Sequence, residues 1–298
     1  MLEAGLIASR FVHFVAVLSL FGAALFPLYA IRGDDAGLRP KLRLILLGLI
    51  VLALASGAGW FIFTAGAMAG DAALAFDPDT LSMLRSTEFG QLWLARLVLL
   101  LVGLVLLAWW PRALWGPSIA LVTVLVLLSL AGTGHARATE GALGLIHSTA
   151  DATHLLAAGT WLGGLWPLGL VIAASLRDTS NTSAIAELLR RFSGVGTIAV
   201  ATLVASGLVQ TWILVGTPTA LISSGYGRLL LAKVALFLVM VALATANRFW
   251  LTPQLSRNPT SQKYLARLRH HVIGEQALGL GVIGIVSILG TLQPPVAL

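Results

Sequence analysis

The chain has 298 residues, of which 58% are hydrophobic and only 10% are charged, with a formal net charge of +7. Its many apolar runs of about 20 residues, the length that spans a bilayer as a helix, predict a polytopic membrane protein. The basic balance is typical of the loops of such a protein and does not indicate nucleic-acid binding, and the absence of cysteine excludes disulfides and thiolate metal sites.

In chain order, the apolar runs predict an all-α bundle of eight transmembrane helices. The expected spans cover about 8–31, 43–66, 91–110, 115–133, 146–175, 193–215, 228–248 and 271–292. The first run has no basic segment before it and continues too long for a cleaved signal. We therefore interpret it as a retained span.

The basic residues predict the orientation of the bundle. Thirteen of the 19 lie near the connections after the first, third, fifth and seventh expected spans. The positive-inside rule makes these connections cytoplasmic and both termini periplasmic, in agreement with an even number of spans. The loop over 67–90, on the other side, is acidic. It is either a solvated loop or one that attracts cations or a basic partner.

Three ordered matches between the halves predict an internal duplication. FGQLWLAR at 89–96 matches YGRLLLAK at 226–233, Ala-Ser-Gly occurs at 55–57 and 205–207, and a glycine follows His13 and His154 by nine residues. We expect two parallel four-helix repeats within one membrane domain, over residues 1–133 and 134–298. His13 and His154 would then lie at equal depth and meet across the repeat interface.

The segment over 134–167 carries the strongest chemical signal. His147, Asp151 and His154 stand at i, i+4 and i+7, a spacing that places all three on one face of a helix. Ionisable side chains inside an apolar span are costly unless they pair, line water or bind something. A copper site, a zinc site or a proton path would each explain them.

The helical rise between His147 and His154 is about 10 Å, too far for both to bind one ion on a regular helix. The sequence therefore favours a site made by His154 and His13. Asp151 is expected to be a further ligand or to orient an imidazole. We expect His135 and His147 to form a site at the mouth that hands the ion inward.

Arg96, Lys233 and Glu275 are further ionisable residues of the expected spans. We interpret Arg96 and Lys233 as cations that extend to the membrane interface, the alternative being that they hold an anionic group such as Asp151 or a haem propionate. Glu275 is expected to be an acid at a helix start. Its alternative role is that of an exit-side ligand or proton carrier.

Together, several segments resemble the copper resistance D (CopD) membrane proteins. They are RFVHFVAVLSLFGAALFPLYA, FGQLWLARLVLLL, GHA at 134–136, HLLAAGTWLGGLWPL, RRFSGVG and YGRLLLAKVALFLVMVALATANRF. The resemblance covers nearly the whole chain. It implies an inner-membrane protein that moves copper toward the cytoplasm, with a separate small periplasmic copper-binding partner (CopC-like). It also implies metal-associated positions at His13, His135, His147 and His154.

We therefore expect a copper transporter that accepts the ion at the periplasmic face and passes it inward. No nucleotide-binding or hydrolytic motif is present in the sequence, so we expect no enzyme activity. The alternative is a b-type haem-binding electron-transfer protein with His13 and His154 as axial ligands. A third hypothesis is an assembly factor whose polar residues only hydrogen-bond between helices.

Overall fold

The structure is a computed structural model that describes residues 1–31, 38–109, 115–131, 133–134, 139–177, 182–258 and 261–297. The described residues form helices and short connections, without strands, which confirms the all-α class. The α-helices are α1 (Leu2–Ala30), α2 (Leu38–Ala69), α3 (Pro78–Ser86), α4 (Glu88–Trp109), α5 (Trp115–Ala131), α6 (Gly141–Ala158), α7 (Gly164–Ser175), α8 (Thr182–Val215), α9 (Pro218–Ser223), α10 (Gly225–Ala246), α11 (Thr252–Arg257) and α12 (Gln262–Leu289). Two short 3₁₀ turns, η1 (Ala72–Phe76) and η7 (Pro295–Ala297), and two π-helical turns, η4 (Gly159–Gly163) and η6 (Asn247–Leu251), complete the described elements.

Seven helices of the described chain are long and apolar enough to cross a membrane. They include two compound helices, Gly141–Ser175 and Gly225–Arg257, that continue through the π-helical turns. The expected span at 115–133 corresponds to α5, a shorter apolar helix near the lower length limit for crossing a bilayer. The count of eight spans therefore depends on α5 and stays a prediction.

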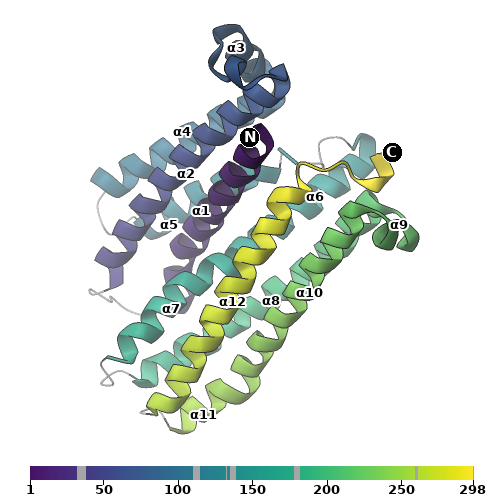
Figure 1. Ribbon diagram of the computed structural model, residues 1–298. Coiled ribbons are helices and arrows are strands. Elements are labelled where there is room, and N and C mark those ends of the chain that lie inside the picture. Colours follow the sequence, from purple (N-terminus) through teal and green to yellow (C-terminus); the bar gives the residue numbers. More distant parts are fainter. Residues whose placement is uncertain are drawn as a thin grey trace.

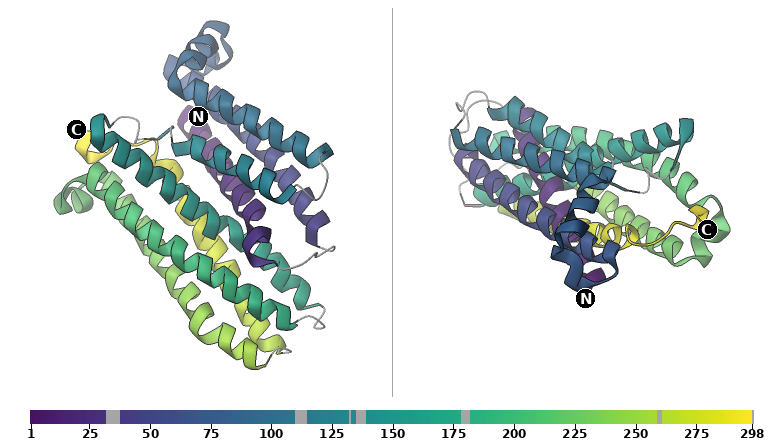
Figure 2. Two further views of the ribbon diagram at one scale, coloured as in Figure 1. Left: turned by 180° about the vertical axis from the view of Figure 1, so that it is seen from behind. Right: turned by 90° about the horizontal axis from the view of Figure 1, so that it is seen from above.

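The helices run side by side, with α1 between two groups (Figures 1 and 2). On one side α1 packs against α2 and α5, and α4 packs against α2 and α5. On the other side α1 packs against η4, α7 and α12, while α6 packs on α8 and α10 on α12. The two termini lie at the same end of the bundle as α3 and α9 (Figure 1). The first helix of the chain therefore contacts both groups, and α5 also packs against α6.

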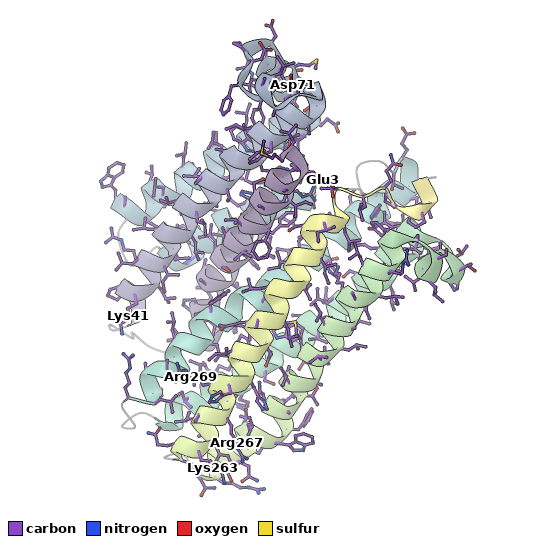
Figure 3. All side chains as sticks on the ribbon, viewed as in Figure 1. Glu3, Lys41, Asp71, Lys263, Arg267 and Arg269 are labelled. Atoms are coloured by element: carbon purple, nitrogen blue, oxygen red, sulfur yellow. The ribbon has the colours of Figure 1, made fainter. Side chains whose placement is uncertain are left out.

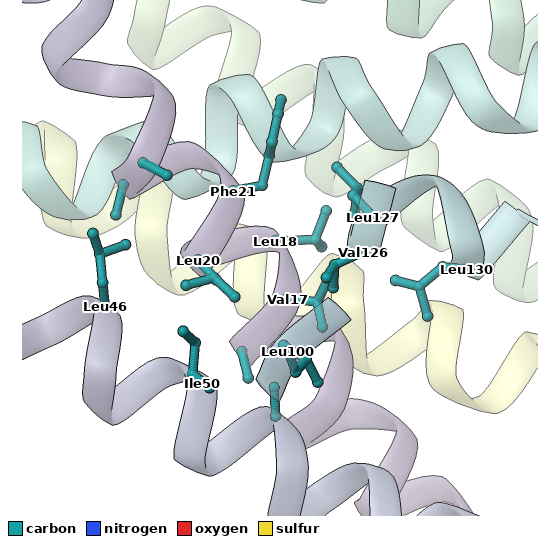
Figure 4. Packing of buried hydrophobic residues seen from close by; sticks show 14 of the residues in the cluster. Val17, Leu18, Leu20, Phe21, Leu46, Ile50, Leu100, Val126, Leu127 and Leu130 are labelled. Carbon is teal, nitrogen blue, oxygen red and sulfur yellow. The ribbon is translucent and has the colours of Figure 1, made fainter. Parts of the chain in front are cut away.

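Apolar side chains fill the space around α1 (Figure 4). Val17 and Leu20 of α1 are almost fully buried against Ile50 of α2, Leu100 of α4 and Val126 of α5. A second cluster belongs to the other group of helices and also takes residues from α1. Lipid tails are as apolar as these side chains, so close packing rather than transfer from water favours the association.

Small residues allow the halves to approach closely. Gly22 of α1 lies against the backbone of Gly163 in η4, with no room for a side chain on either residue. These are the glycines that follow His13 and His154 by nine residues. In membrane bundles such small-residue contacts allow backbones to pack directly.

Each π-helical turn lies next to a proline that follows it. Pro167 lies four residues after Gly163, the last residue of η4, and Pro253 lies four residues after Phe249 of η6. Proline has no N–H to donate to the carbonyl four residues earlier, so the preceding turn is free to widen. π-Helical turns are rare and occur often at functional sites.

The charged side chains labelled in Figure 3 divide between the two ends of the bundle. Glu3 and Asp71 lie at the end that carries the termini, whereas Lys41, Lys263 and Arg267 lie at the opposite end. Arg32 and Arg112, which also supported the predicted orientation, lie outside the described residues.

Candidate metal-binding site

His13 is enclosed in the N-terminal half, with both ring nitrogens occupied. Its Nδ1 lies 3.0 Å from the carbonyl oxygen of Ala53 and 3.3 Å from Oγ of Ser56. A carbonyl only accepts, so Nδ1 carries the proton and Nε2 is the acceptor. Nη1 of Arg96 lies 3.4 Å from Nε2 and donates to it. The Nε2 lone pair is therefore directed at a guanidinium group.

Arg96 does not extend to the membrane interface, so that interpretation was wrong for this residue. Its side chain is 1% exposed, and its Nε and Nη2 donate to Oγ and the carbonyl oxygen of Ser129 at 2.7 and 2.8 Å. Ser129 lies in the last turn of α5, where carbonyl groups have no partner within the helix. The guanidinium also lies 5.6 Å from the ring of Trp60. Arg96 therefore links α4, α5, α1 and α2.

His154, in the C-terminal half, also bonds to a serine through its Nδ1. Its Nδ1 lies 2.9 Å from Oγ of Ser206, which donates its own proton to the carbonyl of Thr202 at 2.6 Å. Ser206 therefore accepts, Nδ1 of His154 carries the proton, and Nε2 keeps its lone pair. Within the described chain that Nε2 has no hydrogen-bond partner, in contrast to Nε2 of His13.

The predicted ladder on α6 faces a cavity of about 410 Å³. We call it the outer cavity. His147, Asp151 and His154 all line it, together with Tyr226 and Lys233 of α10. His147 is buried, and its Nδ1 pairs with Oγ1 of Thr139 at 2.9 Å. The i, i+4, i+7 spacing therefore brings three potential ligands to one space.

Asp151 and Lys233 lie in this cavity without a direct contact. Among the described residues neither side chain makes a hydrogen bond or a close ion pair. Lys233 nevertheless acts electrostatically on both Asp151 and His154. The cavity therefore holds a carboxylate, an open imidazole nitrogen and an ammonium group whose charges are only partly compensated.

The structure does not place all the predicted ligands together. His13 does not line the outer cavity, and His135 lies outside the described residues. Within the described chain, no group of three or more His, Asp or Glu side chains is arranged closely enough to hold a metal ion. The ligand set of His13, His135, His147, Asp151 and His154 therefore stays a prediction.

Sequence reasoning missed several residues of the site. Arg10 of α1 lines the outer cavity and donates to the carbonyl of Gly290 at 3.0 Å. The sequence feature that could have identified Arg10 is its position as a cation one helical turn before His13 in an apolar run. Ser56 and Ser206 were visible only as members of a repeated Ala-Ser-Gly motif, without an indication that each holds a histidine.

Comparison with known proteins gives consistent matches. Residues 1–145 match the family described as Copper resistance protein D-like, N-terminal domain, and residues 186–289 match Copper resistance protein D. Copper resistance protein D of Pseudomonas syringae pv. tomato is 34% identical, over 97% of this chain and 96% of the relative. Inner membrane protein YebZ of Escherichia coli (strain K12) is 33% identical, over 97% and 98%. Copper transport protein CutJ of Bacillus subtilis (strain 168) is 29% identical, over 99% of this chain and 54% of the relative. No solved structure matches the chain.

Proposed function

Because this chain belongs to the copper resistance protein D family, a family of multi-pass inner-membrane proteins, we propose that it transports copper ions across that membrane. Copper enters at the periplasmic face and moves inward. The observation that carries the proposal is the open Nε2 of His154 in a cavity shared with Asp151 and His147. Imidazole and carboxylate groups suit Cu²⁺.

In this proposal the ion meets His135 and His147 first and then reaches Asp151 and His154. The order follows the chain, since His147 lies two helical turns closer to the start of α6 than His154. Transfer between adjacent weak sites favours transport over storage.

We also propose that the bundle is a duplication, with repeats over 1–133 and 134–298. Two helix starts support it. Oγ1 of Thr87 accepts from the N–H of Gly90 at 3.1 Å, and Oγ of Ser224 accepts from the N–H of Gly227 at 2.9 Å. Both glycines lie against the backbone of the short helix before them. His13 on Gly57 and His154 on Gly207 form a second matched pair of contacts.

The proposed orientation places both termini in the periplasm. The separation of Glu3 and Asp71 from Lys41, Lys263 and Arg267 supports it, because cytoplasmic ends carry the excess of Lys and Arg (Figure 3). A separate CopC-like periplasmic protein is the proposed donor of copper. The acidic segment around α3, at the end of the bundle that carries the termini, is the surface we expect a basic or metal-loaded partner to approach.

Copper content of the purified protein tests the site. We expect His154→Ala and Asp151→Asn to lower the bound copper per chain, and His270→Ala, which changes an exposed histidine, to leave it unchanged. His13→Ala should keep the copper content of the wild type. Unchanged content in both His154→Ala and Asp151→Asn would rule out this site.

The comparisons give no support to the haem alternative. A bis-histidine haem also needs both Nε2 atoms to face one space, whereas Nε2 of His13 faces Arg96. The visible spectrum of the purified protein distinguishes the two functions, because a Soret band would indicate haem.

A further inference from the structure

A second cavity lies next to the outer cavity, within the C-terminal half. We call it the inner cavity. It has a volume of about 270 Å³ and is enclosed by residues of α7, α8, α12 and the junction of α10 with η6. Trp161, which is 2% exposed, lines both cavities. The indole ring of Trp161 therefore forms part of the partition between them.

Glu275 of α12 lies against this partition from the inner side. Its side chain lines the inner cavity, and the residue is 2% exposed. Nδ2 of Asn247 donates to Oε1 of Glu275 at 2.7 Å, and the side chain of Trp161 lies close to the same carboxylate. A buried carboxylate thus lies between Trp161 of the partition and Asn247 of η6.

The polar contacts continue toward the inner end of α12. Nδ1 of His271 lies 2.8 Å from Oδ1 of Asn247. Because the amide nitrogen of Asn247 donates to Glu275, its oxygen accepts, and Nδ1 of His271 is the donor. His271 is only partly buried, one turn before Glu275 on the same helix. The chain of contacts therefore runs from Trp161 through Glu275 and Asn247 to His271.

Among the described residues that line the inner cavity, no cation pairs with Glu275. Its described lining has one other charged residue, Arg248, whose Nη1 donates to the carbonyl and Oγ of Ser193 at 2.9 and 3.2 Å and to Oγ1 of Thr197 at 2.5 Å. Within the described chain Glu275 has no ion-pair partner. The groups that face it from neighbouring helices are Trp161 and Asn247, both neutral.

The two π-helical turns of the described chain supply these two neighbours of Glu275. Trp161 belongs to η4 and Asn247 belongs to η6. A widened turn shifts the side chains that follow it relative to a regular helix, and such turns concentrate at functional sites. Both departures from regular helix in the C-terminal half therefore converge on one carboxylate.

We propose that Glu275 is the proton-binding carboxyl group that couples copper transport to proton movement, with Trp161 as the partition between the two cavities. The proposal rests on the transport function proposed above. In the coupling step one carboxylate oxygen of Glu275 takes a proton from hydronium on one side of the partition, which leaves water. It later gives the proton to a water molecule on the other side. In each transfer one O–H bond breaks and one O–H bond forms. A single buried carboxylate with neutral neighbours is suited to carry a proton, since its charge is costly in the membrane without a counterion.

The test uses the full-length protein in proteoliposomes, with one internal dye for copper and another for pH. In the wild type we expect copper flux with a simultaneous proton signal and a flux that depends on pH. Glu275→Gln should bind as much copper as the wild type but lose the proton signal and the pH dependence. Glu275→Asp, which keeps the carboxyl group, should retain both.

Glu187→Gln is the matched control, because Glu187 is a partly exposed acid paired with Arg190 and Arg191 on α8. It should behave as the wild type. A wild-type copper flux without proton movement, or a normal proton signal in folded Glu275→Gln, would overturn the coupling proposal while transport stands. Loss of bound copper in Glu275→Gln would identify a copper ligand and also overturn it. Absence of copper flux in the wild type would overturn both proposals.

Discussion

The backbones of Gly22 and Gly163 lie in direct contact where α1 crosses η4, so that neither residue has room for a side chain. This contact joins the two halves of the bundle. It lies in the same two segments as His13 and His154, nine residues further along each. The depth of the two histidines relative to each other therefore depends on it.

Replacement of Gly22 by leucine should separate the halves. We expect Gly22→Leu to lower the free energy of unfolding by about 1–3 kcal/mol, because the added side chain meets backbone atoms that have little freedom to move. Unfolding by SDS in mixed micelles measures the change. Gly48→Leu is the control, since nothing lies within 4 Å of a Cβ at Gly48. Equal stability of the two variants would contradict the role of the crossing.

Removal of the Arg96 side chain should destabilise the N-terminal half. Arg96→Ala leaves Ser129 and His13 without their donor, and hydrogen bonds to charged groups contribute about 1.5–3 kcal/mol each. We expect a loss of about 2 kcal/mol or more, measured by the same unfolding assay. Arg228→Ala, which removes an exposed cation at the outer end of α10, should have little effect. If Arg96 were only a cation at the membrane interface, Arg96→Ala and Arg228→Ala would lower the free energy of unfolding by similar amounts.

Neutralisation of Lys233 should strengthen copper binding. Lys233 acts on Asp151 and His154 from across the outer cavity, and its positive charge repels a metal cation at the proposed site. We expect Lys233→Met to lower the dissociation constant by about tenfold, or about 1.4 kcal/mol. Titration of the purified protein with copper measures it. Arg228→Met is the matched control and should leave the dissociation constant unchanged. Weaker copper binding in Lys233→Met would contradict a copper site beside Asp151 and His154.

The stability of the first turn of α3, which begins after Asp77, should depend on pH. Oδ2 of Asp77 accepts from the N–H and Oγ1 of Thr80, and these bonds hold the pKa of the Asp77 carboxyl below its ordinary value of 3.8. Because the pKa is lowered in the folded state, these bonds stabilise α3 fully at a pH above 3.8. The stabilisation is lost as the pH falls through the lowered pKa of the folded state. Asp77→Ala should therefore accelerate amide exchange in α3 at neutral pH.

Hydrogen–deuterium exchange of the peptide over 78–86 measures this effect. The difference between Asp77→Ala and the wild type should disappear at a pH below the lowered pKa. Asp79→Ala, which removes a neighbouring carboxylate while its backbone N–H still reaches Asp77, should exchange more slowly than Asp77→Ala. Equal exchange at neutral pH in the wild type and Asp77→Ala would contradict the role of Asp77 as the N-cap of α3.

The sequence by itself determined the all-α class of this protein and its family. Apolar runs long enough to cross a bilayer have few structural choices, because every backbone N–H and C=O must find its partner within the segment. The family resemblance was confirmed over nearly the full chain. The spacing of His147, Asp151 and His154 predicted their common face, since helical periodicity is a local property.

Only the tertiary structure decided which of the two histidines has an Nε2 without a hydrogen-bond partner in the described chain. His13 and His154 have similar surroundings in sequence, each in an apolar helix with a matching Ala-Ser-Gly motif elsewhere. The guanidinium of Arg96 reaches Nε2 of His13, whereas Lys233, at the matching position, makes no hydrogen bond within the described chain and leaves Nε2 of His154 facing a cavity. That difference depends on the three-dimensional reach of two side chains across helices, which sequence periodicity does not contain.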